Sequence, residues 1–220
     1  MNREKMVRYG GPAAILGGVM HVLAFVAVLY LIYFAFAEEA KGTFFGQHAF
    51  IHMIDVAMFA LLAAGATGVY LSQSGLLGRI AKAGFFLTLA GFGLSVVGGL
   101  TIIVVGLAVS DEATLGVLDI ITHPLAQLLY TLGSAIFGFA LLRKGTLPKP
   151  GALLVAVGTL ALFALFITGN QKAVVPITAS VVATGLGWAT LGHGIRGQEQ
   201  PTGASLSIAE ERLRPPNPAA

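Results

Sequence analysis

Cysteine is absent from the 220 residues of this chain, and its absence excludes several kinds of chemistry. Without thiols there is no disulfide, no cysteine-bound iron–sulfur cluster and no thiolate metal site. Charge is also scarce, because Asp, Glu, Lys and Arg together make up 10% of the residues, against about 25% in soluble domains. So few charges cannot coat a surface that faces water, which indicates that lipid covers most of this protein.

Several familiar motifs are missing as well. The sequence has no Gly-x-x-x-x-Gly-Lys-Ser/Thr, no His-Glu-x-x-His and no Gly-x-Ser-x-Gly pattern, so ATP-driven chemistry and serine hydrolysis have no support. The net charge is +3 and the pI about 9.3, but the basic residues stand singly or in small groups between apolar runs. They form no basic stripe interleaved with aromatics, so we expect no nucleic-acid partner.

Hydrophobic residues, by contrast, make up 56% of the chain and form long runs. A helix needs ~20 apolar residues to cross a bilayer, and six segments qualify: 11–36, 47–72, 83–109, 120–142, 151–168 and 174–193. The first run is longer than the ~7–15 apolar residues of a signal peptide, so we interpret it as a retained span. The sequence therefore predicts an all-α polytopic membrane protein with six transmembrane helices, short loops and the bilayer as its main partner.

The basic residues alternate from one side of the predicted membrane to the other. One set of links and termini carries Arg3, Lys5 and Arg8, then Arg79 and Lys82, then Arg143, Lys144 and Lys149, then Arg196. The opposite links carry Glu38, Glu39 and Lys41, then Asp111, Glu112 and Asp119, then Lys172 alone. Short cytoplasmic loops are enriched in Lys and Arg, so we expect a cytoplasmic (inner) membrane protein with both termini cytoplasmic.

The two ends of the chain and the aromatic residues complete this topology. We expect residues 1–10 to form a cytoplasmic N-terminus and residues 197–220, which are polar and proline-rich, to form a disordered cytoplasmic tail. Tyr9, Tyr70 and Trp188 fall near the predicted inner boundary, as expected for an aromatic belt. Tyr130 falls near mid-membrane instead, where its hydroxyl needs a buried partner.

Glycine pairs suggest an internal repeat. Every span has two glycines seven apart near its cytoplasmic end: Gly10/Gly17, Gly84/Gly91 and Gly151/Gly158 in outward-running spans, Gly68/Gly75, Gly138/Gly145 and Gly187/Gly194 in inward-running ones. Small residues at such spacing let helix backbones approach closely in lipid. The pattern predicts a helical hairpin repeated three times, with spans six and one forming the third copy, and an approximate threefold axis along the membrane normal.

Ionisable residues inside the spans are the candidate functional residues, because such groups are costly in lipid. The second span carries His48, His52 and Asp55, and the fourth carries Asp119, His123, Gln127 and Tyr130, both at helical spacing. Both stripes lie at matching depth in the outer half, so we expect them to face each other. His21 in the first span is expected to approach Asp55 near mid-membrane.

This cluster permits three kinds of site. His48 and His52, with His123 and Asp55, have the ligand types that bind zinc or iron. Alternatively, His52 and His123 bind a haem axially, with Gln127 and Tyr130 as supporting hydrogen-bonders. In the third interpretation, Asp55 and His52 relay protons or bind a small polar ligand.

Other observations favour a structural role for some of these residues. His48 and Asp119 lie at the water interface, and Pro124 is typical of a helix start, where His123 meets headgroups.

The His48-x-x-x-His52 spacing is similar to one motif of the membrane hydrolases related to alkaline ceramidases and adiponectin-type receptors. That resemblance implies a zinc held by three histidines and an aspartate. It covers a few residues only, and those proteins usually have seven spans and a second paired motif, where this chain offers only His193.

The sequence therefore leaves three functions open. The first is a binding or transport-type membrane protein whose His52, Asp55, His123, Gln127, Tyr130 and His21 hold a metal ion, haem or small polar ligand. The second is a metal-dependent membrane enzyme, either an oxidoreductase or a hydrolase. The third is a structural subunit of a membrane complex or homo-oligomer, with the histidines incidental.

Overall fold

The computed structural model describes residues 2–30, 44–108, 112–168 and 174–199. Side chains within this set are not described at 28–30, 44–50, 112–116, 118, 119, 198 and 199. The described residues form six helices: α1 (Arg3–Tyr30), α2 (Phe44–Gln73), α3 (Arg79–Ala108), α4 (Glu112–Lys144), α5 (Lys149–Ile167) and α6 (Val174–Glu199). The predicted all-α class and the six predicted spans are confirmed, since all six helices are long and apolar enough to cross a membrane.

The helices differ from the predicted spans mainly at their ends. Helix α1 begins at Arg3, within the expected N-terminal segment, and α6 continues to Glu199, into the expected tail. Residues 200–220 lie outside the described residues, so the disorder predicted for them stays a prediction. Pro124 lies inside α4, and the expectation that it starts a helix was wrong. A proline in a helix interior removes one backbone hydrogen bond, and in α4 the helix continues through it.

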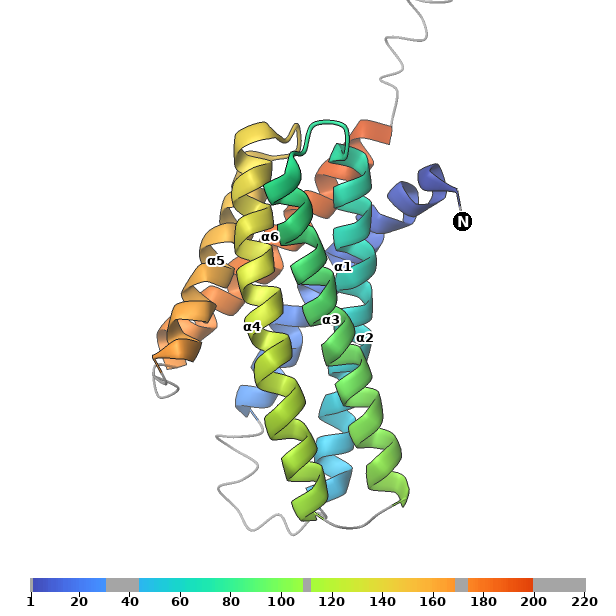
Figure 1. The fold of residues 1–220 in the computed structure, drawn as a ribbon, viewed down its shortest axis with the longest axis vertical. Helices are drawn as coiled ribbons and strands as arrows, with labels where there is room; N and C mark the ends of the chain where they lie inside the picture. The colour runs from blue at the N-terminus through green and yellow to red at the C-terminus, as the bar shows by residue number, and fades with distance from the viewer. Residues whose placement is uncertain (1, 31–43, 109–111, 169–173, 200–220) are drawn as a thin grey trace, which may run out of the picture.

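The six helices form a closed ring in chain order. Each helix packs against its neighbours in the sequence, and α6 closes the ring by packing against α1. Figure 1 shows α2, α3 and α4 as long, nearly parallel helices, with α1 and α6 crossing behind them. Helices α2, α3 and α4, which are consecutive in the chain, together line one narrow pocket.

One end of the ring gathers the basic residues. The start of α1, the α2–α3 turn, the α4–α5 turn and the end of α6 all lie at the same end of the molecule (Figure 1). Every described Lys and Arg belongs to these segments: Arg3, Lys5, Arg8, Arg79, Lys82, Arg143, Lys144, Lys149 and Arg196. We call this end the basic end.

Polar contacts tie the turns together at the basic end. The guanidinium of Arg3 donates hydrogen bonds to the carbonyl of Leu71 (2.8 Å) and the hydroxyl of Ser74 (3.0 Å), so the start of α1 satisfies a carbonyl in the last turn of α2. The side-chain oxygen of buried Gln73 accepts from the backbone amide (2.8 Å) and hydroxyl (3.1 Å) of Thr146. Gln73 thereby joins the end of α2 to the α4–α5 turn.

Glycines bring the helices into backbone contact. A Cβ atom built at Gly84 would meet the backbone of Phe137, and one at Gly91 would meet the backbone of Tyr130, so α3 lies directly against α4. Gly17 contacts α2 at Leu62 in the same way, and Gly158 contacts α6 at Thr184. The outward-running glycine pairs therefore all face the helix that follows their own in the chain, and not the helix that precedes it in the predicted hairpin. Such close contacts between small residues are expected for packing in lipid. The threefold superposition of hairpins stays a prediction.

Aromatic side chains fill the centre of the ring. Trp188 is only 1% exposed, and its ring lies 6.2 Å from that of Phe92 and 6.5 Å from that of Phe137, centroid to centroid. The expectation that Trp188 belongs to an interfacial belt was therefore wrong. Tyr70 stacks on Phe85 with centroids 4.1 Å apart, which also directs it toward the packed interior.

Candidate functional site

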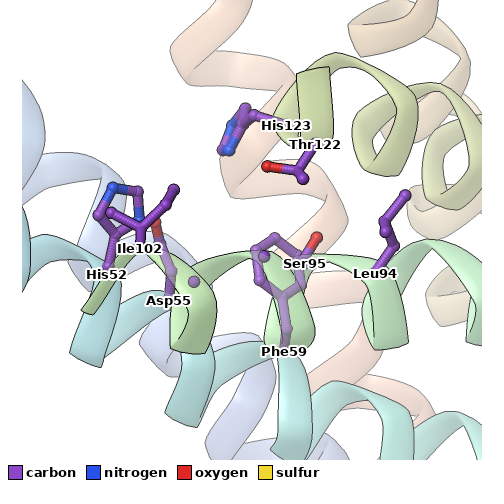
Figure 2. A pocket seen from close by; sticks show the side chains of 10 residues that line it. His52, Asp55, Phe59, Leu94, Ser95, Ile102, Thr122 and His123 are labelled. Carbon is purple, nitrogen blue, oxygen red and sulfur yellow. The ribbon is translucent and has the colours of Figure 1, made fainter. Parts of the chain in front are cut away.

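A narrow pocket lies between α2, α3 and α4, in the half of the helices away from the basic end. Ten residues line it: His52, Asp55, Phe59, Leu94, Ser95, Gly98, Gly99, Ile102, Thr122 and His123. Figure 2 shows the histidine and threonine of α4 on one side and His52 and Asp55 of α2 on the other. The pocket thus brings together polar residues from both stripes predicted by the sequence.

Helix α2 supplies the acid and the first imidazole. His52 and Asp55 are three residues apart, so their side chains leave the helix on one face. His52 is 8% exposed and Asp55 is half-buried. Both lie in the apolar span Ile51–Gln73, where an ionised carboxylate is costly unless a cation or hydrogen bonds stabilise it.

Helix α4 supplies the second imidazole and a hydroxyl. His123 is exposed and Thr122 half-buried, so His123 stands at the rim of the pocket while His52 lies deeper. His123 and Thr122 lie inside α4, since this helix begins at Glu112. His123 is therefore held by a helical backbone on both sides.

Helix α3 forms the wall that sequence reasoning missed. A Cβ at Gly98 would come within 3.0 Å of the Thr122 hydroxyl oxygen, and one at Gly99 within 2.7 Å of a Val56 methyl. These two glycines let α2 and α4 approach α3 closely enough to enclose the pocket. Ser95 adds a hydroxyl, which donates to the carbonyl of Gly91 at 3.1 Å. The Gly98-Gly99 pair was the available signal in the sequence.

An aromatic group lies next to the pocket, toward the basic end. The rings of Phe59, Phe92 and Tyr130 lie 5.5 to 5.7 Å from one another, centroid to centroid. The buried Tyr130 hydroxyl is hydrogen-bonded to the Gln127 side chain, and Asp55 lies close enough to act on it electrostatically. Tyr130 therefore has a hydrogen-bond partner, the half-buried Gln127, as the sequence required. Gln127 and Tyr130 are not among the residues that line the pocket, and they lie beside it.

His21 on α1 is separate from this group. It is 7% exposed, and neither ring nitrogen has a hydrogen-bond partner among the residues that the structure describes. It does not line the pocket, and it forms no hydrogen bond with Asp55, which it was expected to approach. A buried donor without an acceptor lowers stability by about 1–3 kcal/mol, so His21 is a local weakness of the packing.

Replacing His21 by leucine is therefore expected to raise the free energy of unfolding by about 1 kcal/mol, because the orphaned ring nitrogens disappear while the volume stays similar. Thermal unfolding in detergent measures this, with the exposed His193→Leu as the matched control. A marked loss of stability in His21→Leu alone contradicts the prediction and indicates that His21 has a polar partner.

The predicted metal site consists of His48, His52, His123 and Asp55. Among the residues that the structure describes, no group of three His, Cys, Asp or Glu side chains lies close enough to hold a metal ion. His52, Asp55 and His123 therefore do not form such a group by themselves, and the side chains of His48 and Asp119 lie outside the described residues. The four-residue metal set therefore stays a prediction that depends on His48.

The size of the pocket limits what fits in it. Its cavity volume is about 10 Å³, which is near the lower limit for one water molecule. A haem between His52 and His123 would require α2 and α4 to separate. The geometry is suited to a proton, a water molecule or a single small ion.

Comparisons of this chain with protein-family models, with curated proteins and with solved structures give no match.

Proposed function

We propose that this polytopic membrane protein binds a proton or a single small cation at Asp55, in a binding or transport-type role. The observation that carries the proposal is the shared pocket: one carboxyl group and two imidazoles, from α2 and α4, line the same narrow cavity inside the apolar spans. His52 and His123 serve as hydrogen-bonding neighbours and proton acceptors, and Ser95 and Thr122 add hydroxyl oxygens.

The chemistry of Asp55 favours a positively charged ligand. A charged side chain at the centre of a membrane helix costs about 2.5–3.5 kcal/mol on insertion scales, and Asp55, the fifth residue of the span Ile51–Gln73, bears part of that cost. A proton or a cation bound at Asp55 neutralises the carboxylate and removes that cost, whereas a bound anion adds a second negative charge and raises the cost. Imidazole gains and loses protons near neutral pH, and exposed His123 at the rim gives the deeper Asp55 and His52 a polar route outward.

Transport is tested in proteoliposomes that contain a pH-sensitive dye. A potassium diffusion potential is imposed, and proton entry is followed with and without Na⁺ as the competing cation. We expect wild-type flux above that of empty liposomes and reduced flux in His123→Ala. His193→Ala, an exposed histidine near the end of α6, is the matched control and should match wild type. Flux equal to empty liposomes in the wild type overturns the transport role.

Orientation forms part of the proposal. The basic end carries every described Lys and Arg, so we place it in the cytoplasm, with the pocket in the outer half of the bilayer. This assignment gives a cytoplasmic (inner) membrane protein with cytoplasmic termini.

Single cysteines test this topology without background, because the chain has none of its own. Gly78, the position of the Gly78→Cys substitution, lies at the basic end with open space around it. Thr168, the position of Thr168→Cys, lies at the end of α5 that is away from the basic end. A membrane-impermeant maleimide should label Thr168→Cys in intact cells and Gly78→Cys only after lysis. The reverse labelling pattern contradicts the orientation.

The metal-dependent enzyme remains the second candidate because His48 lies one helical turn before His52 in α2. Elemental analysis of protein purified without chelators is the test. Stoichiometric zinc or iron that is lost in His48→Ala and retained in His193→Ala favours the metal site. If variants at His48, His52, Asp55 and His123 alter neither metal content nor flux, the remaining interpretation is a structural subunit.

A further inference from the structure

A second groove lies at the basic end, between the first turn of α3 and the last turns of α4. It has a volume of about 590 Å³. Its apolar part includes Ile80, Ile136 and Phe139, and its charged part consists of Arg79, Arg143 and Lys144. All the charged residues that line it are basic.

The apolar part faces outward from the helix bundle. Ile80 is 76% exposed and Phe139 is 44% exposed, although both belong to helices that are apolar enough to span a membrane. In a bilayer, side chains in this position contact acyl chains. The groove therefore offers an acyl chain a surface between two helices.

The charged part lies where the two helices end. Arg79 begins α3, and Arg143 and Lys144 lie in the last turn of α4. The first amide groups of α3 have no acceptor within the helix and add partial positive charge at the same end. The last carbonyl groups of α4 lie at the same end and carry the opposite partial charge, so an anion at this position gains mainly from the three basic side chains.

We propose that this groove binds an anionic phospholipid, with its phosphate against Arg79, Arg143 and Lys144 and one acyl chain along Ile80, Ile136 and Phe139. A free phosphate uses only the charged part, whereas a phospholipid uses both. Basic pockets at the cytoplasmic ends of membrane helices are suited to such headgroups.

The basic groove at the α1–α2 end is a weaker candidate for the same ligand. Its charged lining consists of four basic residues, Arg3, Lys5, Arg8 and Arg196, and the acidic Glu4. Arg3 is already hydrogen-bonded to Leu71 and Ser74. The α3–α4 groove has neither feature among its lining residues, so we assign the lipid to it.

The experiment is native mass spectrometry of the purified protein with added phosphatidylglycerol or phosphatidylcholine. Each basic residue contributes roughly fivefold in affinity for an anionic lipid surface. We therefore expect a preference of about 100-fold for phosphatidylglycerol in the wild type. In Arg143→Gln/Lys144→Gln the preference should fall by about 25-fold.

Two controls make this result specific. Lys5→Gln/Arg8→Gln removes two charges at the α1–α2 groove and should keep the preference. Inorganic phosphate should not displace the lipid, and displacement by phosphate alone overturns the lipid assignment. Equal binding of both lipids by the wild type, or loss of preference in both double variants, overturns the site. Melting temperatures in phosphatidylcholine confirm that each variant is folded.

Discussion

Replacing Gly91 by leucine is expected to lower the free energy of unfolding by about 3 kcal/mol, because overpacking against backbone cannot be relieved by turning a side chain. A Cβ at this position would come within 2.6 Å of the Tyr130 Cβ and 2.7 Å of its Cα. The leucine therefore forces α3 and α4 apart. Thermal unfolding in detergent, followed by near-ultraviolet circular dichroism, measures the change.

Gly93 offers a matched control on the same helix. No atom of the described residues lies within 4 Å of a Cβ built at Gly93, so Gly93→Leu should leave stability unchanged or raise it slightly, since leucine is a better helix former than glycine. Equal destabilisation by both substitutions contradicts the close packing of α3 on α4. The pocket should also be disturbed in Gly91→Leu, because Tyr130 lies beside Asp55.

Replacing Asp55 by asparagine is expected to abolish proton or cation flux in proteoliposomes. Asparagine keeps the size and the carbonyl oxygen of the side chain but carries no charge and does not exchange a proton in this pH range. In the proposed function, the negative charge of Asp55 in an apolar span is the feature that attracts a cation. Flux in Asp55→Asn should therefore equal that of empty liposomes, measured as the rate of change in internal pH.

Two further variants show whether a loss of flux is caused by the lost charge of Asp55 or by a change in folding. Asp55→Glu restores the carboxyl group and should recover part of the flux, with the remainder lost because the pocket is narrow. Thr101→Val alters an exposed hydroxyl that bonds within its own helix, so it should retain full flux. Wild-type flux in Asp55→Asn, with normal melting behaviour, removes Asp55 from the proposal.

The spans could be predicted from sequence because lipid imposes a simple rule. A segment in the bilayer must be apolar for ~20 residues and must satisfy its own backbone, and α2, α3 and α5 agree with the predicted spans to within a few residues. Local signals were less reliable. Pro124 usually indicates a helix boundary, but α4 continues through it, since helix packing and length in lipid outweigh one lost hydrogen bond.

The site was predictable only where residues share a helix or a depth. His52 and Asp55 share a face of α2 by spacing alone, and equal depth placed His123 opposite them. The contribution of α3 to the pocket could not be predicted this way. Gly98 and Gly99 line the pocket because α4 and α2 pack against them, and spacing along α3 does not show which helices lie beside it. His21 does not line the pocket, and this depends on how α1 is rotated about its axis within the ring of helices. The spacing of residues along α1 does not determine that rotation.

Infrared difference spectroscopy of the purified protein, during stepped changes of pH and Na⁺ concentration, measures directly whether Asp55 binds a proton or a small cation within the pocket, as we propose. We expect a carboxyl stretching band that changes with the bound ion in the wild type and in His193→Leu, and that is missing in Asp55→Asn. Identical difference spectra for the wild type and Asp55→Asn would contradict the proposal.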